Sequence, residues 1–381
     1  MAKRSLLIFI GLVAIAMTAG LIAYSRFQQA WSEPLGPSLG LPTLTPTAPV
    51  IQPSSTPIAV AQAGSGEISF PRTTRPPSTS TPDPTATPEP LCGGPPVMTI
   101  LGVGADSRAD SYLYGLADVI RVARVDFVTP KITVLSIPRD IWVEIPGIEE
   151  HYGITHGKLN QSYLYGGDGM GYYDGPGFGP GLLARTLDQN FGLRVDHYGA
   201  VNMSTFVRIV DAVGGIDIYL PQAVDGRPID EQTEDMGFFD AGQHHFTGIQ
   251  ALKFSRIRKK YNDFTRMDHQ NMVLCALREK ILSPAVLPDI PQIIGAFEGS
   301  VLTDLSLEQL SQVACLAPQV DSEDLIFTGI PQEMLEANRQ YSPQLKAYTF
   351  TYNVDPEAMR QLMADFQAGL WPTGPDEPSC E

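Results

Sequence analysis

The stretch Thr133 to Gly167, TVLSIPRDIWVEIPGIEEHYGITHGKLNQSYLYGG, decides how the rest of the chain is interpreted. Residues 133–137 form a β-branched, apolar run of strand length, and Pro138 ends it. Arg139 and Asp140 therefore follow a buried strand, at the edge of the sheet where open α/β folds usually bind ligands. The planar fork of an arginine there suits a phosphate or a carboxylate. The alternative is that Arg139 and Asp140 pair with each other and brace a turn.

The charge of the chain excludes one large class of partner. The 381 residues carry a formal net charge of -16, and after Pro90 there are 21 basic and 38 acidic residues. Affinity for nucleic acid comes mainly from basic side chains that neutralise phosphates. A domain this acidic is a poor nucleic-acid binder, so no nucleic acid is expected as a partner.

The N-terminal part predicts a membrane anchor and a tether. Leu6 to Tyr24 is free of charge and follows Lys3 and Arg4. This pattern favours one spanning helix with its N-terminus in the cytoplasm, and a cleaved signal peptide is the alternative. Residues 33–90 contain fourteen prolines among many Ser and Thr, which predicts disorder. We therefore expect an anchor at 1–26, a disordered linker at 27–91 and an extracytoplasmic catalytic domain at 92–381.

Strand and helix patterns alternate through that domain. The fold class expected is α/β, an α-β-α sandwich whose central mixed sheet is flanked by helices. The glycine-rich segment 166–181 is predicted as a loop, either a mobile lid or an insertion. Expected strands are 98–103, 119–125, 133–137, 142–145, 198–201, 216–220, 325–330 and 348–352. Expected helices are 182–191, 204–213, 248–254, 263–282 with Asp263 as its cap, 306–317 with a Ser306 and Gln309 capping box, and 356–367.

The four cysteines predict disulfides, because an even number is expected outside the cytoplasm. Four cysteines allow three pairings. Cys92 and Cys380 lie at the two ends of the domain, and Cys275 and Cys315 lie on two expected helices. We favour the pairs Cys92 with Cys380 and Cys275 with Cys315.

Polar side chains gather at the ends of the expected elements and suggest a phosphate site. Several arginines in an acidic domain are explained by a pyrophosphate ligand held through charge-assisted hydrogen bonds. Two of the aspartates are of the type that holds Mg²⁺ beside substrate phosphates. The alternative is a network of surface ion pairs, which contribute little. The residues concerned are Asp106, Arg108, Asp118, Arg139, Asp140, Lys158, Asn160, Arg256, Arg258, Asp263, Arg266 and Gln270.

The order and spacing of these motifs resemble the LytR-CpsA-Psr family of extracytoplasmic enzymes, from about Val97 to Leu282. The motifs are GADSR at 104–108, SIPRD at 136–140, KLN at 158–160, YLYGG at 163–167, HY at 197–198, DAVGG at 211–215, GIQALKFSRIRK at 248–259 and DFTRMDHQ at 263–270.

The resemblance implies a phosphotransferase. Such enzymes move a glycopolymer, for instance one like teichoic acid, from a polyprenyl-pyrophosphate carrier onto a peptidoglycan acceptor and form a phosphodiester. It further implies a central sheet flanked by helices, with an apolar slot for the polyprenyl chain. Two other functions stay open, a pyrophosphatase acting on the same carrier and a non-catalytic binder of anionic wall polymer.

The resemblance also assigns roles by position. Arg108, Arg139, Arg256, Arg258 and Arg266 would grip the pyrophosphate, Lys158, Asn160 and Gln270 would shape the site, and Asp106 and Asp118 would hold Mg²⁺. Arg139, Asp140, Arg256, Arg258 and Asp263 are the expected catalytic residues. The sequence departs from the family pattern at Leu116 and Val119, where an Arg and a Thr are usual, and at Lys259, where many relatives have His.

Overall fold

The computed structural model describes residues 25–26, 28–41, 88–107, 112–231, 233–286, 293, 299–344, 346–373 and 380. The expected anchor at Leu6 to Tyr24, most of the expected linker, and Arg108 lie outside these residues. None of the helices within the described ranges is both long enough and apolar enough to cross a membrane.

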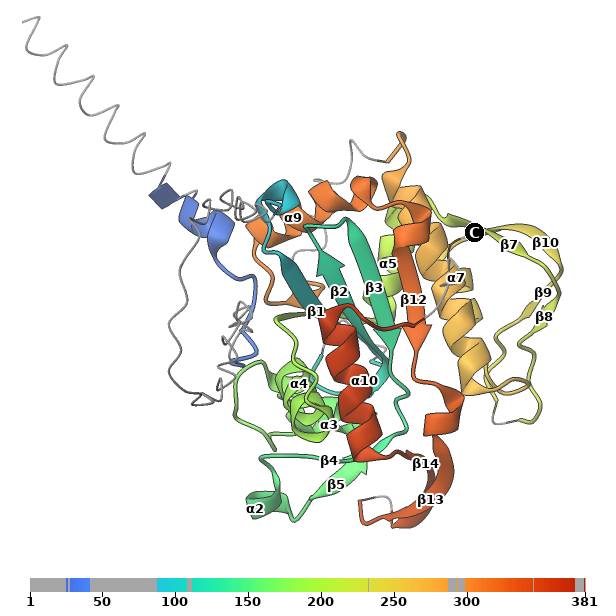
Figure 1. The fold of residues 1–381 in the computed structure, drawn as a ribbon. Coiled ribbons are helices and arrows are strands. Elements are labelled where there is room, and N and C mark those ends of the chain that lie inside the picture. The colour runs from blue at the N-terminus through green and yellow to red at the C-terminus, as the bar shows by residue number, and fades with distance from the viewer. Residues whose placement is uncertain are drawn as a thin grey trace, which may run out of the picture.

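A mixed sheet of six strands forms the centre of the fold (Figure 1). Its strand order is β11-β6-β1-β2-β3-β12, with β1 parallel to β6 and β3 parallel to β12. The other neighbours are antiparallel. These strands are β1 (Val97–Ala105), β2 (Ala117–Asp126), β3 (Lys131–Ser136), β6 (His197–Asn202), β11 (Leu302–Thr303) and β12 (Leu325–Gly329).

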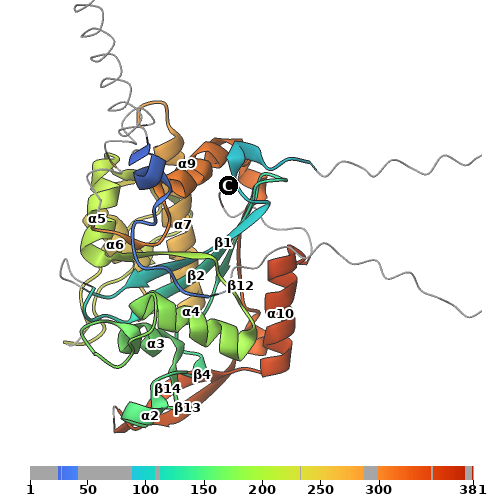
Figure 2. The same ribbon diagram turned by 90° about the vertical axis from the view of Figure 1, so that its left-hand side faces the viewer.

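Helices cover both faces of this sheet, which confirms the predicted central mixed sheet flanked by helices (Figure 2). One face carries α3 (Leu159–Gly166), α4 (Phe178–Phe191) and α10 (Pro356–Ala368). The other carries α5 (Met203–Ala212), α6 (Gly248–Ser255) and α7 (Asp263–Leu282). β1 shows why two layers form, because Leu101 and Val103 enter the core under α3 and α4, while Gly102 and Gly104 face the other layer.

Smaller elements surround these layers. Two-stranded ribbons are β4 (Trp142–Glu144) with β5 (His156–Lys158), β7 (Ile216–Leu220) with β10 (Gly242–Phe246), β8 (Val224–Asp225) with β9 (Phe238–Phe239), and β13 (Glu336–Ser342) with β14 (Ala347–Asn353). Further helices in the described ranges include α2 (Glu149–Tyr152) and α9 (Leu307–Leu316), with short 3-10 turns at Leu91–Gly93 (η1), Ala317–Gln319 (η3), Ser322–Asp324 (η4) and Gln332–Met334 (η5).

Local signals set most helix starts, with two corrections to the predictions. Ser306 and Gln309 form the predicted capping box of α9. The cap of α7 is Asn262, whose side chain accepts a hydrogen bond from the Thr265 N–H at 2.8 Å, so Asp263 is the first helical residue and not the cap. α4 begins at Phe178, so the last residues of the predicted loop 166–181 are helical.

Part of the segment predicted to be a disordered linker packs against the domain. Leu39 is 2% exposed and belongs to the core under α4. The Tyr198 hydroxyl donates to the Pro37 carbonyl at 3.0 Å, and Pro34 forms a β-bridge with Ser306. The prediction of disorder is therefore wrong for residues 34–41, because Leu39 and Leu41 in this proline-rich stretch pack against the core, which composition does not reveal.

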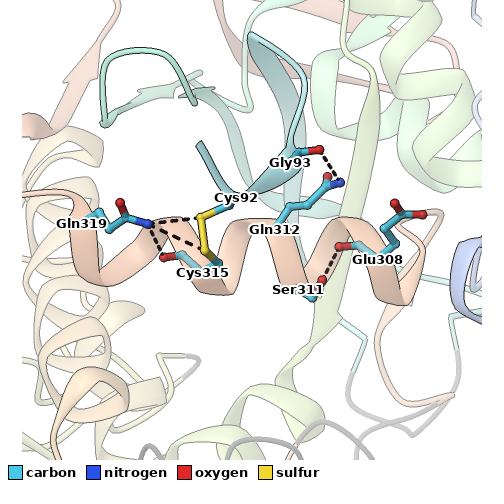
Figure 3. Close-up of a disulfide and its surroundings, with 7 residues drawn as sticks. All are labelled: Cys92, Gly93, Glu308, Ser311, Gln312, Cys315 and Gln319. Atoms are coloured by element: carbon cyan, nitrogen blue, oxygen red, sulfur yellow. Dashed lines mark hydrogen bonds between the residues drawn. A yellow bond between two sulfur atoms is a disulfide. The ribbon is translucent and has the colours of Figure 1, made fainter. Parts of the chain in front are cut away.

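The predicted disulfide pairing is also wrong. Cys92 pairs with Cys315 of α9, and Cys275 of α7 pairs with Cys380. Figure 3 shows Cys92 lying over α9, where Gln319 donates to its sulfur at 3.2 Å and Gln312 donates to the Gly93 carbonyl at 3.0 Å. The prediction assumed that the two ends of the domain meet each other, whereas each end meets a different helix.

Candidate active site

The polar residues predicted from the sequence converge at one edge of the central sheet. β1 and β3 both run antiparallel to β2, so the ends of β1 and β3 lie beside the start of β2. Asp106 follows β1 directly, Asp118 is the second residue of β2, and Arg139 comes shortly after β3. Three separate motifs therefore reach the same place because the strand order brings them there.

Arg139 is the centre of an ion-pair network at this edge. Its guanidinium Nη1 contacts Asp118, its Nε lies 3.5 Å from Asp140 Oδ2, and Lys158 Nζ donates to Asp140 Oδ1 at 2.7 Å. Burial alone would lower the pKa of Arg139, but the charges of Asp118, Asp140 and Asp263 outweigh burial and raise it. The Asn160 N–H donates to the Arg139 carbonyl at 3.1 Å and fixes the backbone.

A second basic group comes from the end of α6 and the start of α7. Arg256 is the C-cap of α6, and its Nη2 donates to Glu234 Oε2 at 3.1 Å. Arg266, on the first turn of α7, pairs with Asp263 Oδ1 at 2.8 Å. Burial lowers the pKa of Arg266, against the attraction of Asp263. Gln270, one turn further on, donates to the Ser255 carbonyl at 3.3 Å and so joins α7 to α6.

Several buried polar atoms of this network have no hydrogen-bond partner. They are the Nε atoms of Arg139 and Arg266 and Oδ1 of Asn160. A buried guanidinium N–H without an acceptor costs free energy unless a ligand supplies one. Arg139 Nε already faces the Asp140 carboxylate at 3.5 Å, so the Nε of Arg266 is the donor of this pair that an anionic ligand would satisfy.

Two hollows meet at this network. The larger, of about 660 Å³, lies between the sheet and helices α5, α6 and α7, and the smaller, of about 460 Å³, lies beside Asp140 and α3. Asp106, Asp118, Arg256 and Arg258 line both. Nine basic and five acidic residues line the two hollows together, within a chain whose net charge is strongly negative.

Small residues keep the larger hollow open on its sheet side. Gly102 and Gly104 of β1, Gly199 of β6 and Ala123 of β2 line it, where larger side chains would fill the space. Its opposite wall is apolar and includes Phe206, Met236, Leu252, Ile257 and Val273. The hollow is thus an apolar chamber with a charged mouth.

Most of the predicted site residues take part in this arrangement. The structure brings together Asp106, Asp118, Arg139, Asp140, Lys158, Asn160, Arg256, Arg258, Arg266 and Gln270, each of which lines at least one hollow. Asp263 lines neither and forms an ion pair with Arg266. Arg108 lies outside the described residues.

The two predicted metal ligands, Asp106 and Asp118, are both hydrogen-bonded to Leu116. The backbone N–H groups of Asp106 and Asp118 both donate to the Leu116 carbonyl at 3.0 Å, and Asp106 Oδ1 accepts from the Leu116 N–H. Within the described residues, no three His, Cys, Asp or Glu side chains group as metal ligands. Mg²⁺ in phosphoryl-transfer sites commonly takes only one or two carboxylates and completes its shell with water and phosphate oxygens, so two aspartates are of the number and type that such an ion takes.

Two residues of the site were missed in the sequence. Arg121 of β2 is buried, donates to Asn271 Oδ1 at 2.6 Å and to Gln270 Oε1 at 3.3 Å, and lines the larger hollow. Burial, reinforced by Arg266, lowers its pKa to about 10. The sequence signal that could have identified Arg121 is its position as a charged residue in the middle of a mainly apolar strand. Tyr352 donates its N–H to the Asp140 carbonyl at 2.9 Å, and nothing local predicts this contact.

The comparisons with known proteins agree on one family. The sequence profile of the LytR_cpsA_psr family matches residues 94–362. A polyisoprenyl-teichoic acid–peptidoglycan teichoic acid transferase TagU from Oceanobacillus iheyensis is 34% identical over 215 residues, which are 56% of this chain and 60% of that protein. A transferase of the same name from Bacillus cereus is 31% identical over 239 residues, which are 61% of this chain and 69% of that protein.

The fold also has solved counterparts. The crystal structure of Bacillus subtilis TagV matches with a TM-score of 0.53 at 22% identity. The match covers 71% of this chain and 97% of that chain. At this level of identity the likeness concerns the fold alone.

Proposed function

The chain belongs to the LytR-CpsA-Psr family, and on that premise we propose that it is a phosphotransferase. It moves a glycopolymer from a polyprenyl-pyrophosphate carrier to a peptidoglycan acceptor and forms a phosphodiester. The names of the TagU relatives support a transferase that acts between polyisoprenyl-linked teichoic acid and peptidoglycan. This chain matches only part of the length of those relatives. The substrates proposed for it are therefore inferred from the residues of its own site.

The observation that carries the proposal is the junction of the two hollows. An apolar chamber of about 660 Å³ meets a smaller polar hollow at Arg256 and Arg258. A polyprenyl-pyrophosphate has the same division, an apolar chain joined to an anionic head. The lipid would occupy the chamber, and its pyrophosphate would lie at the mouth, where the arginine donors converge.

The arginines supply binding and charge stabilisation. Arg139, Arg256, Arg258 and Arg266 contact the pyrophosphate oxygens, and Arg108 joins them according to the family resemblance. Lys158, Asn160 and Gln270 orient these side chains and shape the pocket. Charge that develops on the transferred phosphoryl group is offset by the guanidinium groups, which are already in place before the reaction.

The reaction exchanges one phosphorus–oxygen bond for another. The acceptor hydroxyl oxygen bonds to the phosphorus that carries the glycopolymer, and the bond from that phosphorus to the bridging oxygen breaks. Polyprenyl phosphate leaves with the bridging oxygen. The hydroxyl proton passes to a carboxylate of the site, and Asp140 is better placed than Asp263 because it lines the smaller hollow.

Asp106 and Asp118 would hold Mg²⁺ in this scheme. The ion would add positive charge beside the pyrophosphate oxygens. Leu116 lies between the two aspartates and lines the smaller hollow, at the position where relatives usually have an arginine. The site of this chain thus relies on fewer guanidinium groups at that edge.

The proposal also places the domain outside the cytoplasm, held by one helix at Leu6 to Tyr24. The two disulfides agree with an oxidising compartment. Protease added to intact protoplasts should digest the domain. Protection of the domain from the protease would contradict this location.

The test is to incubate the purified full chain with a polyprenyl-pyrophosphate-linked sugar and Mg²⁺ and to follow release of polyprenyl phosphate. Release that requires a peptidoglycan acceptor, and that is lost in Arg139→Ala and Asp106→Ala, supports the transferase. Release without acceptor identifies a pyrophosphatase instead. Binding of the donor without any release leaves a non-catalytic binder.

A further inference from the structure

The β13–β14 hairpin exposes aromatic side chains on one face. Tyr341 lies opposite Tyr348, Arg339 opposite Phe350, and Ala337 opposite Tyr352. Residues opposite each other, and residues two apart on one strand, share a face of a ribbon. Tyr341, Tyr348 and Phe350 are 49%, 65% and 45% exposed.

The other face of the hairpin is the one that packs against the protein. Ser342 and Thr351 on that face are fully buried. The hairpin therefore buries small polar residues and presents rings to solvent, which is the reverse of the usual distribution. An exposed group of large aromatic side chains commonly marks a binding surface.

The rings form two ordered pairs. Tyr341 and Tyr348 lie edge to face with centroids 5.5 Å apart, and Phe350 and Tyr352 do the same at 5.0 Å. Arg339 is held against the strand by a hydrogen bond from its Nη2 to the Tyr348 carbonyl at 3.3 Å. These contacts restrict the side chains, so little conformational entropy is lost when a ligand binds.

The aromatic face is continuous with the candidate active site. Tyr352 donates its N–H to the Asp140 carbonyl, and Ile141 and Tyr352 form a parallel β-bridge. Burial, together with the charges of Asp263 and Asp140, raises the pKa of the Tyr352 hydroxyl. In both ribbon views the hairpin extends away from the central sheet beside β4 (Figures 1 and 2). From Tyr352 to Tyr348 the strand covers about 13 Å, the length of a short oligosaccharide.

The chemistry of the face fits a glycan better than a protein or a lipid. It carries tyrosine and phenylalanine rings and one arginine, and Leu, Ile, Val and Met are absent from β13 and β14. Ring faces contact the C–H surface of sugars, while tyrosine hydroxyls and a guanidinium hydrogen-bond to sugar hydroxyls. The donor lipid fits the chamber between the sheet and α5 to α7, so the hairpin is left for the other substrate.

We propose that the exposed aromatic face of the β13–β14 hairpin is the docking surface for the acceptor glycan. The proposal rests on the transferase function inferred above and names where its second substrate binds. A glycan strand that lies along Tyr348 and Phe350 reaches Asp140 at the edge of the smaller hollow, where the acceptor hydroxyl must enter.

The experiment compares the full chain with a Tyr348→Ala, Phe350→Ala double variant. Tyr219→Ala is the matched control, because Tyr219 is 64% exposed on β7 in a different ribbon. Sedimentation with purified peptidoglycan sacculi measures binding, and release of polyprenyl phosphate at varied acceptor concentration gives KM and kcat. The double variant should lose at least tenfold in binding and gain at least tenfold in acceptor KM, with kcat and donor KM little changed. Tyr348→Phe, which keeps the ring, should retain most of the binding.

The outcomes separate this proposal from the transferase function. Unchanged sacculus binding and acceptor KM in the double variant would overturn the docking surface while leaving the transferase intact. If no acceptor supports release, the transferase fails, yet sacculus binding that is lost only in the hairpin variant still supports the surface. If the double variant instead loses binding to phospholipid vesicles and keeps binding to sacculi, the face contacts membrane and the proposal is wrong.

Discussion

Arg139 and Asp118 form an ion pair although they are 21 positions apart in the sequence and different strands position them. The same guanidinium also lies beside Asp140, which Lys158 holds from its other side. Two residues assigned to different tasks, one to pyrophosphate and one to metal, are thus in direct contact. A ligand phosphate entering the site would bind against an arginine that is already oriented by carboxylates.

We expect Arg139→Ala to lower kcat/KM for the donor by about 100-fold or more, because it removes a preformed contact to the phosphate and leaves the Asp118 carboxylate without its arginine partner. Arg139→Lys should recover only part of the activity, since an ammonium keeps the charge and loses the planar fork. Steady-state release of polyprenyl phosphate measures both. Arg194→Ala is the control, because Arg194 pairs with Asp188 at 3.1 Å on the surface away from the site. Equal loss in Arg194→Ala would show that the effect is not specific to the site.

Substitutions of Gly199 test whether the larger hollow holds the lipid. It lines the hollow, and a Cβ added there meets no atom within 4 Å. Gly199→Leu should therefore leave the fold intact and fill part of the chamber, which would raise the KM for a long-chain polyprenyl donor at least tenfold. Gly199→Ala, which adds one methyl group, should have a much smaller effect. An unchanged KM for long-chain donors in Gly199→Leu would place the lipid elsewhere.

Local patterns predicted much of the fold, and contacts between distant segments account for what they missed. The strand Ile216–Leu220 was predicted with its observed limits, and the helix Asp263–Leu282 was predicted over the same range apart from its cap, because alternation, helical spacing and turn residues are adjacent in sequence. Arg139 was identified because it follows a recognisable strand, and Asp118 because it precedes one. Tyr352 was missed because its contact with Asp140 joins residues far apart in the sequence. The glycines at 102 and 199 had no visible role until the sheet placed them on one wall of a cavity.

The disulfide pairing illustrates the same limit and gives a third prediction. Peptide mapping without reduction should recover Cys92 linked to Cys315 and Cys275 linked to Cys380. Replacing both members of either pair with Ser should lower the free energy of unfolding by about 2–4 kcal/mol. Cys92 and Cys380 pack against the hydrophobic cluster around Phe127 and Leu316, and none of the four cysteines lines either hollow, so activity at low temperature should persist. Recovery of Cys92 linked to Cys380 would contradict the structure.

The packed segment before the domain gives a fourth prediction. Leu39→Ala should reduce the free energy of unfolding by about 2–5 kcal/mol, because it opens a cavity in the core under α4. Leu35→Ala is the matched control, since Leu35 is 42% exposed and its truncation should change stability by no more than about 0.5 kcal/mol. Urea unfolding of the full chain in detergent measures both. Equal, small effects would mean that residues 34–41 do not pack against the domain in solution.

The burial of His269 leads to a prediction of how the stability of the domain depends on pH. Its ring packs against Phe254 with centroids 4.5 Å apart, and burial lowers its pKa from 6.5 to about 4. As the pH falls below about 6.5, the unfolded chain binds a proton at this imidazole and the folded chain does not, so the free energy of unfolding decreases until about pH 4. Above pH 6.5 both states are neutral at this residue, and it contributes no pH dependence.

The measurement is urea unfolding at pH 7.0, 5.5 and 4.5 for the full chain and for His269→Phe. The variant keeps a ring in the same space and cannot be protonated, so its stability should fall less between pH 7.0 and pH 4.5 than that of the unaltered chain. His156→Gln serves as the control, because His156 is exposed on β5 and its replacement should leave the slope unchanged. If His269→Phe loses stability on acidification as steeply as the unaltered chain, His269 binds its proton equally in the folded and unfolded states, and burial does not lower its pKa.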